Sequence, residues 1–227
     1  MIDEIVRQRL EDKVAVIEMD DGKVNAISHA MIDALNGALD RAEREARAIV
    51  LGGRSGRFSG GFDLGAMRGS AEEARTLIVR GTELALRLYA FPLPIVAACT
   101  GHAIAMGAVI LLTADTRFGV DGAFKIGLNE VAIGLPLPPF VLRLAEARLS
   151  KRHLVRATLE AEIYTPAGAA DAGFLDRVAS SDALGAESLA EAKRLALLDP
   201  AAFQPSKIGL RAETIARIRA ESGLAPA

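Results

Sequence analysis

Two glycine-rich segments carry the residue types that could stabilise charge in a reaction. The first, Phe58 to Leu64, reads Phe-Ser-Gly-Gly-Phe-Asp-Leu, and the second, Gly101 to Ala108, reads Gly-His-Ala-Ile-Ala-Met-Gly-Ala. We expect each segment to join a strand to a helix. The first turn of a helix has unpaired N–H groups and the positive end of the helix dipole, which attract a developing oxyanion. The two segments therefore predict an oxyanion hole; the plainer interpretation is tight turns, with Asp63 capping a helix.

Signatures of several other chemistries are missing from the sequence. The glycines between Gly52 and Gly61 fit neither the Gly-x-x-x-x-Gly-Lys-Ser/Thr phosphate loop nor the Gly-x-Gly-x-x-Gly dinucleotide pattern. The three histidines are scattered, and Cys99 lies alone in an apolar run, where we expect a buried, inert thiol. No metal site can be drawn from these residues. ATP, NAD and metal chemistry therefore lose support, and His102 is the one histidine within a candidate segment.

The composition indicates one main domain that handles a small molecule. The chain has 227 residues, 51% of them hydrophobic, which is enough for one substantial core. Lys and Arg total 27 against 29 for Asp and Glu, so no broad basic surface is expected to bind nucleic acid. Charges near the start argue against a signal peptide, and no window reaches the roughly 18 apolar residues of a membrane span. We expect a cytoplasmic protein without a membrane partner.

Apolar periodicity alternates between strand and helix along most of the chain. Strands are expected over residues 14–19, 48–51, 93–98 and 116–120. Helices are expected from Ser28, which can cap the first of them, over 72–89, over about 105–114, and after the proline-rich stretch 135–139. Residues 52–61 between the second strand and second helix should form a glycine-rich loop. This alternation predicts an α/β fold.

Beyond Ser150 the pattern becomes mainly helical. Thr165-Pro166 fits the cap and first residue of a helix, and Asp199-Pro200 marks a break before the last helix. We expect residues 1–164 to form the core with the active site. Residues 165–227 should form a helical region that caps this core or packs on a neighbouring subunit.

The two glycine-rich segments, in this order and spacing, resemble the crotonase superfamily, also called the enoyl-CoA hydratase/isomerase family. The likeness extends to Val-Asn-Ala-Ile-Ser at residues 24–28 and to residues 165–178. The resemblance implies a spiral of ββα units with a helical C-terminal region, assembled as a homotrimer or a pair of trimers. It also implies an acyl-coenzyme A substrate, so that coenzyme A arrives with the substrate and no separate cofactor or metal is needed.

The resemblance implies roles for individual positions. The backbone N–H groups of Gly60 and Met106 would be the oxyanion donors, and the Met106 side chain, where the family usually has glycine, would narrow the acyl tunnel. The substrate groove would be lined by two short runs and one loop residue, namely Asn25, Ala26, Ile27, Phe62, Asp63, Leu64 and His102. Four basic residues are candidates for the phosphates, although each could be an ordinary solvated charge: Lys23, Arg54, Arg57 and Lys207.

One carboxylate separates the activities that the resemblance allows. Val109 stands where hydratases carry their first glutamate, and Glu130 stands where they carry the second, within an Ile-Gly-Leu-Asn-Glu run similar to the 3-enoyl to 2-enoyl-CoA isomerases. The other lining positions, Ile133 and Leu135, are apolar, so the pKa of Glu130 should be raised. A single carboxylate can remove a proton at C2 and return it at C4 without activating water. We therefore expect an isomerase, unless Glu130 is an ordinary solvated loop residue.

Two other functions stay open at this point. One is another crotonase-type reaction, such as slow hydration, thioester hydrolysis or decarboxylation, although Val109 argues against efficient hydration. The other belongs to a different class, a non-catalytic subunit that binds acyl-CoA and has lost its chemistry.

Overall fold

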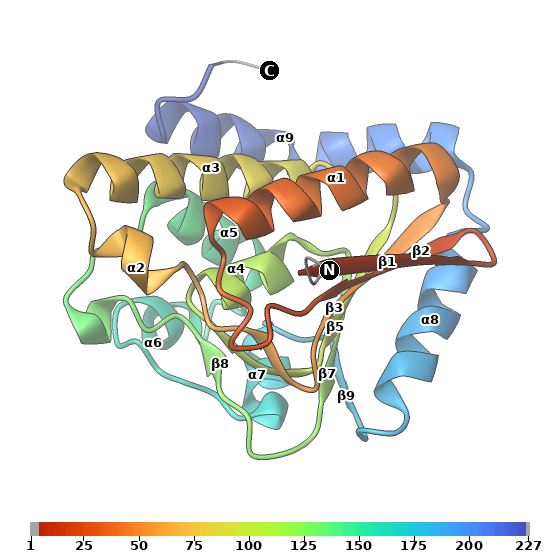
Figure 1. Cartoon of the computed structure of the whole chain (residues 1–227), viewed down its shortest axis with the longest axis horizontal. Helices are drawn as coiled ribbons and strands as arrows, with labels where there is room; N and C mark the ends of the chain where they lie inside the picture. The colour runs from red at the N-terminus through yellow and green to blue at the C-terminus, as the bar shows by residue number, and fades with distance from the viewer. Residues whose placement is uncertain (1–4, 226–227) are drawn as a thin grey trace.

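Two β-sheets surrounded by helices make up the part of the chain that the structure describes, residues 5–225 (Figure 1). The structure is a computed structural model. The main sheet contains β1 (Val6–Glu11), β2 (Val14–Met19), β3 (Ala48–Gly53), β5 (Ile95–Cys99), β7 (Thr116–Val120) and β9 (Arg177–Ala179), and the small sheet contains β4 (Gly56–Ser59), β6 (Gly101–Ile104) and β8 (Ile126–Gly127). The helices are α1 (His29–Glu45), α2 (Leu64–Met67), α3 (Ala71–Tyr89), α4 (Met106–Thr113), η1 (Val131–Ile133), α5 (Pro139–Arg148), α6 (Leu154–Thr158), α7 (Pro166–Ala172), α8 (Leu184–Leu195) and α9 (Pro200–Glu221). The expected α/β class is confirmed.

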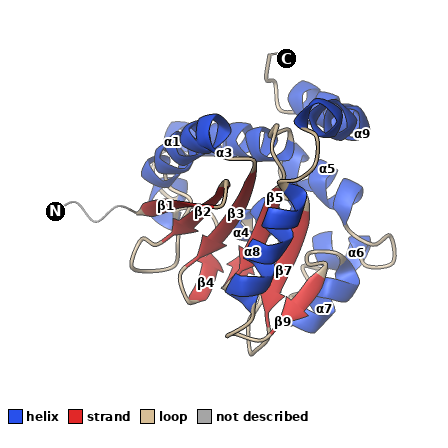
Figure 2. Cartoon of the chain, turned by 90° about the vertical axis from the view of Figure 1, so that its right-hand side faces the viewer, coloured by secondary structure: helices blue, strands red, loops and turns tan. Residues whose placement is uncertain are grey.

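The central strands of the main sheet, β3 and β5, are buried on both faces. Its strand order is β1-β2-β3-β5-β7-β9; β1 and β2 form an antiparallel hairpin, and all later neighbours are parallel. One face packs on α1 and α3, where Ile49 and Leu51 join a core with Leu35. The other face packs on α8, where Val50 and Val96 meet apolar side chains of that helix (Figure 2). A parallel sheet covered on both sides needs continuously apolar strands, which explains the sequence of residues 48–51.

Side-chain caps fix where the predicted helices begin. Ser28 Oγ accepts a hydrogen bond from Met31 N at 3.2 Å at the start of α1. Thr165 Oγ1 accepts from Gly168 N at 3.2 Å at the start of α7. Asp199 Oδ1 accepts from Ala201 N at 2.9 Å and is followed by Pro200 at the first position of α9. These contacts satisfy N–H groups that a helix start leaves unpaired. They confirm the predicted caps Ser28 and Thr165, and they show that the predicted break at Asp199-Pro200 is also a cap.

The small sheet was not predicted, because its strands lie in segments that read as glycine-rich loops. β4, β6 and β8 run parallel in the order β4-β6-β8. The close approach of the backbones requires glycine: a Cβ placed on Gly53 would lie 2.4 Å from Arg57 O, and one on Gly101 would lie 2.1 Å from Gly56 C. The carboxyl ends of parallel strands meet at one edge, where functional residues commonly gather. Gly60, Ala105 and Leu128 begin the segments that leave this edge.

The C-terminal region is mostly helical but also completes the main sheet. β9 pairs in parallel with β7 at the edge of the sheet, and α8 covers the sheet face described above. α9 packs against α5. Residues 165–227 therefore contribute both a strand and a covering helix to the same body as the preceding residues.

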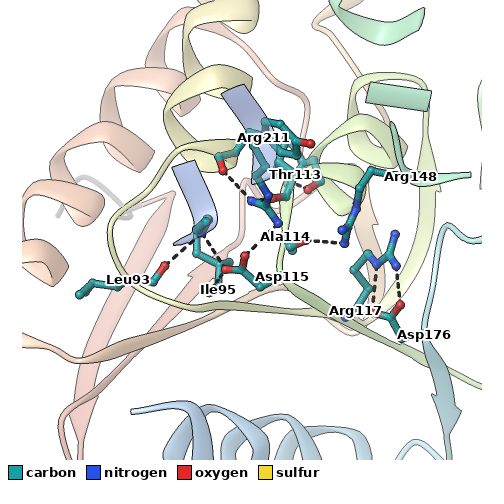
Figure 3. Close-up of polar contacts among 12 residues, drawn as sticks. Leu93, Ile95, Thr113, Ala114, Asp115, Arg117, Arg148, Asp176 and Arg211 are labelled. Carbon is teal, nitrogen blue, oxygen red and sulfur yellow. Dashed lines mark hydrogen bonds and ion pairs between the residues drawn. The ribbon is translucent and has the colours of Figure 1, made fainter. Parts of the chain in front are cut away.

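A buried charge cluster holds α9 against the core. Asp115 accepts from Lys207 Nζ at 2.7 Å and from Arg211 Nη2 at 2.9 Å, and Arg211 also donates to Tyr89 O and Thr113 O (Figure 3). Burial lowers the pKa of Lys207 to about 8, although the nearby Asp115 carboxylate partly offsets this. Lys207 is only 6% exposed. Its expected role as a phosphate contact is therefore wrong, because its ammonium is committed to Asp115 and to Leu93 O.

We predict that Asp115→Asn destabilises the protein, because it leaves two buried cations without their counter-charge. Removing one partner of a buried charge pair costs about 3–5 kcal/mol. The free energy of unfolding, measured with urea, should fall by an amount of this order. Asp33→Asn is the matched control: Asp33 pairs with Arg80 but its side chain is 69% exposed, so its loss should cost less than about 1 kcal/mol. Equal effects of the two substitutions would contradict the account.

Candidate active site

Three segments that are far apart in sequence meet at the carboxyl edge of the small sheet. Ala105 N donates to Gly127 O at 2.9 Å, which places the segment before Met106 beside the one that leads to Glu130. A Cβ placed on Gly61 would lie 3.0 Å from the Cβ of Ala105 and 3.5 Å from Met106 N. The structure thus brings the two glycine-rich segments together at the start of α4.

The Phe62 amide, in the first segment, has no acceptor among residues 5–225. Gly60 N donates to Val24 O at 2.8 Å, and Gly61 N donates to Ser59 Oγ at 3.2 Å, so both are occupied. Ile27 bridges to Phe62 in parallel: Ile27 N donates to Gly61 O, and Asp63 N donates to Ile27 O. A parallel bridge of this kind uses the residues on either side of Phe62 and leaves its own N–H pointing away.

Gly60 as an oxyanion donor is therefore a prediction that the structure contradicts. Among residues 5–225, the Phe62 N–H has no acceptor, whereas the Gly60 N–H is paired. Sequence reasoning missed Phe62 because the choice depends on the bridge to Ile27. That pairing joins residues 35 positions apart and leaves no local signal at Phe62.

The second candidate donor is the amide of Met106, the first residue of α4. It has no acceptor within the described part of the chain, as expected for the first turn of a helix. Ala105 precedes it with φ 52° and ψ −122°, a conformation that normally requires glycine. The Met106 side chain is 1% exposed and belongs to the main core. The expectation that this side chain would narrow an open tunnel is thus not supported by its position.

Glu130 has a partly buried carboxyl group with one oxygen unpaired in the described residues and with a raised pKa. It precedes the 3₁₀ turn η1, its side chain is partly buried, and its Oε2 atom is buried without a hydrogen-bond partner in the described residues. Burial raises the pKa of this carboxyl, and backbone N–H groups of Glu130 and Asn129 offset only part of the shift. A buried acceptor without a partner costs stability, so such an atom calls for an explanation.

The apolar residues expected around Glu130 divide into two groups. Val109 is fully buried in α4. Because its side chain is aliphatic, this position provides no second carboxylate. Ile133 and Leu135 are 57% and 44% exposed, so they lie at the surface of the single chain, and their contact with the substrate stays a prediction. Ile133 ends η1, a short turn that contains no buried residue, and Leu135 follows this turn.

The residues predicted to line the substrate groove also fall into two groups, one buried and one accessible. The Asn25 side chain is fully buried and donates to Met19 O at 2.9 Å and to Phe58 O at 3.2 Å, so it links strands rather than facing a ligand. The Ile27 side chain is likewise buried in the core. Four predicted residues keep accessible surface near the Phe62 amide, namely Ala26, Phe62, Asp63 and Leu64. Asp63 also caps α2, accepting from Ala66 N at 2.9 Å.

His102 lies in β6 and Arg57 in β4 of the small sheet, whereas Lys23 and Arg54 lie outside that sheet. His102 Nδ1 accepts from Lys125 N at 3.0 Å, and its ring stacks edge-on against Phe124. Burial, Arg57 and Lys125 together lower the pKa of His102. Three phosphate candidates remain after Lys207 is excluded. Two of them are hydrogen-bonded to each other, because Arg54 donates to Lys23 O. The third, Arg57, donates to Gly56 O.

Two hollows in the surface lie away from these three segments. One, of about 450 Å³, lies between α3, α5 and the end of α9 and is lined by Ile78, Thr82 and Phe140, among others. Another, of about 690 Å³, lies where α8 leads into α9.

Within residues 5–225, no three His, Cys, Asp or Glu side chains gather as a metal site. No helix in that range is long and apolar enough to cross a bilayer.

Residues 9–221 match the family Enoyl-CoA hydratase/isomerase, and the chain belongs to this family. A family protein from Pseudomonas syringae is 41% identical with a TM-score of 0.96, covering 98% of this chain and 97% of that one. An enoyl-CoA isomerase from Mycobacterium tuberculosis is 39% identical with a TM-score of 0.94, at the same coverage. Human mitochondrial enoyl-CoA delta isomerase 1 is 29% identical over 210 residues, which span 90% of this chain and 70% of the human protein.

These names do not separate isomerase from hydratase. Another structure of the mycobacterial protein describes it as a probable enoyl-CoA hydratase, with 40% identity and a TM-score of 0.93. Two bacterial proteins named as enoyl-CoA hydratases match over 50% and 58% of their own lengths. The family thus establishes the crotonase fold and enoyl-CoA chemistry, and the reaction must be argued from the residues.

We predict that Glu130→Gln changes the pH dependence of stability. Because burial raises the pKa of Glu130 in the folded protein, the folded state binds this proton more tightly than the unfolded chain. Wild-type stability is then lost as pH rises through the folded-state pKa, and the variant avoids this loss. The free energy of unfolding of the variant minus that of wild type should increase from about pH 4.5 toward neutral pH. A difference that is flat or falls with pH would contradict a buried carboxylate.

Proposed function

We propose that the protein moves the double bond of a 3-enoyl-CoA to give the 2-enoyl-CoA. Glu130 removes a proton from C2, the electrons shift toward C4 through an enolate, and the protonated Glu130 returns the proton at C4. The substrate and product have the same atoms, and the carboxylate is regenerated. The observation that carries this proposal is the buried, unpartnered Oε2 of Glu130 together with its raised pKa.

The enolate oxygen would be held by the N–H groups of Phe62 and Met106. Removing the C2 proton moves negative charge onto the thioester oxygen, and fixed main-chain donors stabilise this charge without reorganising. Neither amide has an acceptor among residues 5–225. The α4 dipole adds to the same effect, because Met106 is its first residue.

Val109 favours isomerisation over hydration. Adding water across the double bond needs a group that orients and deprotonates a water molecule, and a valine side chain has neither a donor nor an acceptor. Val109 is fully buried, so its neighbourhood on α4 is apolar. A single carboxylate suffices for a proton transfer from C2 to C4.

The substrate would be an acyl-CoA thioester, bound without a separate cofactor along the accessible surface of Ala26, Asp63 and Leu64.

We also propose a homotrimer or a pair of trimers as the assembly. Two exposed leucines in the C-terminal region support an interface there: Leu197, in the turn between α8 and α9, and Leu210, on α9, are each 86% exposed.

We predict that Glu130→Gln abolishes isomerisation while acyl-CoA binding persists. Loss of a general acid/base group costs about 10²–10⁴ in rate. The measurement is mass spectrometry of a 3-enoyl-CoA incubated in deuterated water, together with calorimetric titration of a saturated acyl-CoA. Wild type should retain the mass of the carbon skeleton and gain deuterium at C2 or C4.

Glu43→Gln, on the exposed side of α1, is the control and should behave as wild type. Undiminished turnover by Glu130→Gln would remove Glu130 from the mechanism. A product heavier by one water would identify a hydratase instead, and tight binding without turnover of any substrate would identify a non-catalytic subunit.

A further inference from the structure

The ring of Phe62 occupies the space that a side chain at residue 81 would need. A Cβ placed on Gly81 would lie 2.4 Å from both Cε1 and Cζ of Phe62, a distance that real Cβ atoms do not reach. Gly81 is buried in the middle of the 19-residue helix α3. Glycine lowers helix stability at such a position relative to alanine. The space that it leaves open is filled by the Phe62 ring.

Phe62 is therefore held from two directions. Its backbone is fixed by the bridge to Ile27, through Ile27 N to Gly61 O at 2.8 Å and Asp63 N to Ile27 O at 3.2 Å. Its ring is fixed by contact with Gly81 on α3. A residue held at both its backbone and the far end of its side chain has little freedom to rotate, so its N–H keeps one direction.

We propose that Gly81 is a positioning residue for the oxyanion donor at Phe62. The absence of a side chain at residue 81 sets where the ring lies, and the ring, together with the bridge to Ile27, holds the direction of the Phe62 N–H. This inference rests on the proposed function, because it assigns the donor role to that N–H. Gly81 itself does not touch the reacting atoms.

A second glycine within a long helix supplies the matched control. Gly37 lies inside the 17-residue helix α1, and a Cβ placed there would meet only Arg41 Nη1, at 3.7 Å. Gly37→Ala therefore makes the same change in helix propensity without touching Phe62. It should raise the midpoint of thermal unfolding and leave kcat and KM unchanged.

The test compares steady-state isomerisation of a 3-enoyl-CoA by Gly81→Ala and Gly37→Ala. Gly81→Ala should lower kcat by about tenfold or more with KM little changed, short of the roughly 10²–10³ that loss of a whole donor costs. A purely structural role would lower the unfolding midpoint without this separation of kcat from KM. Wild-type kcat in a folded Gly81→Ala protein would overturn the proposal.

Phe62→Leu provides a second test, because leucine lacks the ring atoms that would meet the new methyl group. Phe62→Leu alone should lower kcat, since the space at Gly81 is then unfilled, and adding Gly81→Ala should cause no further loss. This non-additivity is the signature of direct contact. Additive losses in kcat would overturn the proposal. An unchanged kcat in Phe62→Leu would also overturn it. The Phe62→Leu variant therefore tests the contact even if Gly81→Ala fails to fold. Wild-type protein that isomerises no 3-enoyl-CoA would contradict the proposed function and with it the role of Gly81.

Discussion

Hydrogen bonding between three short parallel strands is the constraint on which the candidate active site depends. β4 and β6 have four residues each and β8 has two, yet their pairing brings the segments at Phe62, Met106 and Glu130 to one edge. The two candidate donors are main-chain groups, so the backbone path fixes them rather than side-chain identity. Met106 can therefore stand at the start of α4 without removing the donor.

Several features at this edge lower stability. Glu130 has a buried oxygen without a partner, and Ala105 adopts a positive φ at the residue before the Met106 donor. Gly81 weakens α3 at its centre. Strained or unpaired groups persist only where the surrounding structure holds them. Here the central strands of the main sheet, buried on both faces, and the Asp115 cluster under α9 supply that support.

Much of the main fold could be predicted because its signals are local. The apolar runs of β3 and β5, and the caps Ser28, Thr165 and Asp199, lie within a few residues of the elements that they define. β1 was not predicted; it pairs with β2 across a turn at Asp12 and Lys13, both with positive φ. After β2, Asp21 accepts hydrogen bonds from the N–H groups of Lys23 and Asn25 in the loop that leads to α1.

The candidate site was predicted in outline but not in each residue. The Met106 N–H has no acceptor among residues 5–225, and burial raises the pKa of Glu130, as expected; the Met106 side chain and the apolar residues Ile133 and Leu135 are not where they were expected. Gly60 was chosen in place of Phe62, since the deciding bridge to Ile27 is a long-range pairing. The contact between Phe62 and Gly81 was invisible for the same reason. Lys207 looked like a surface cation because its partner, Asp115, lies 92 positions away.

A crystal structure of the protein with a bound acyl-CoA would show directly how the reacting groups are placed. The thioester oxygen should accept hydrogen bonds from the backbone N–H groups of Phe62 and Met106, at about 2.7–3.2 Å, and the Glu130 carboxylate should face C2 of the acyl chain. A thioester oxygen held elsewhere, or a Glu130 side chain turned away from the acyl chain, would contradict the proposed mechanism.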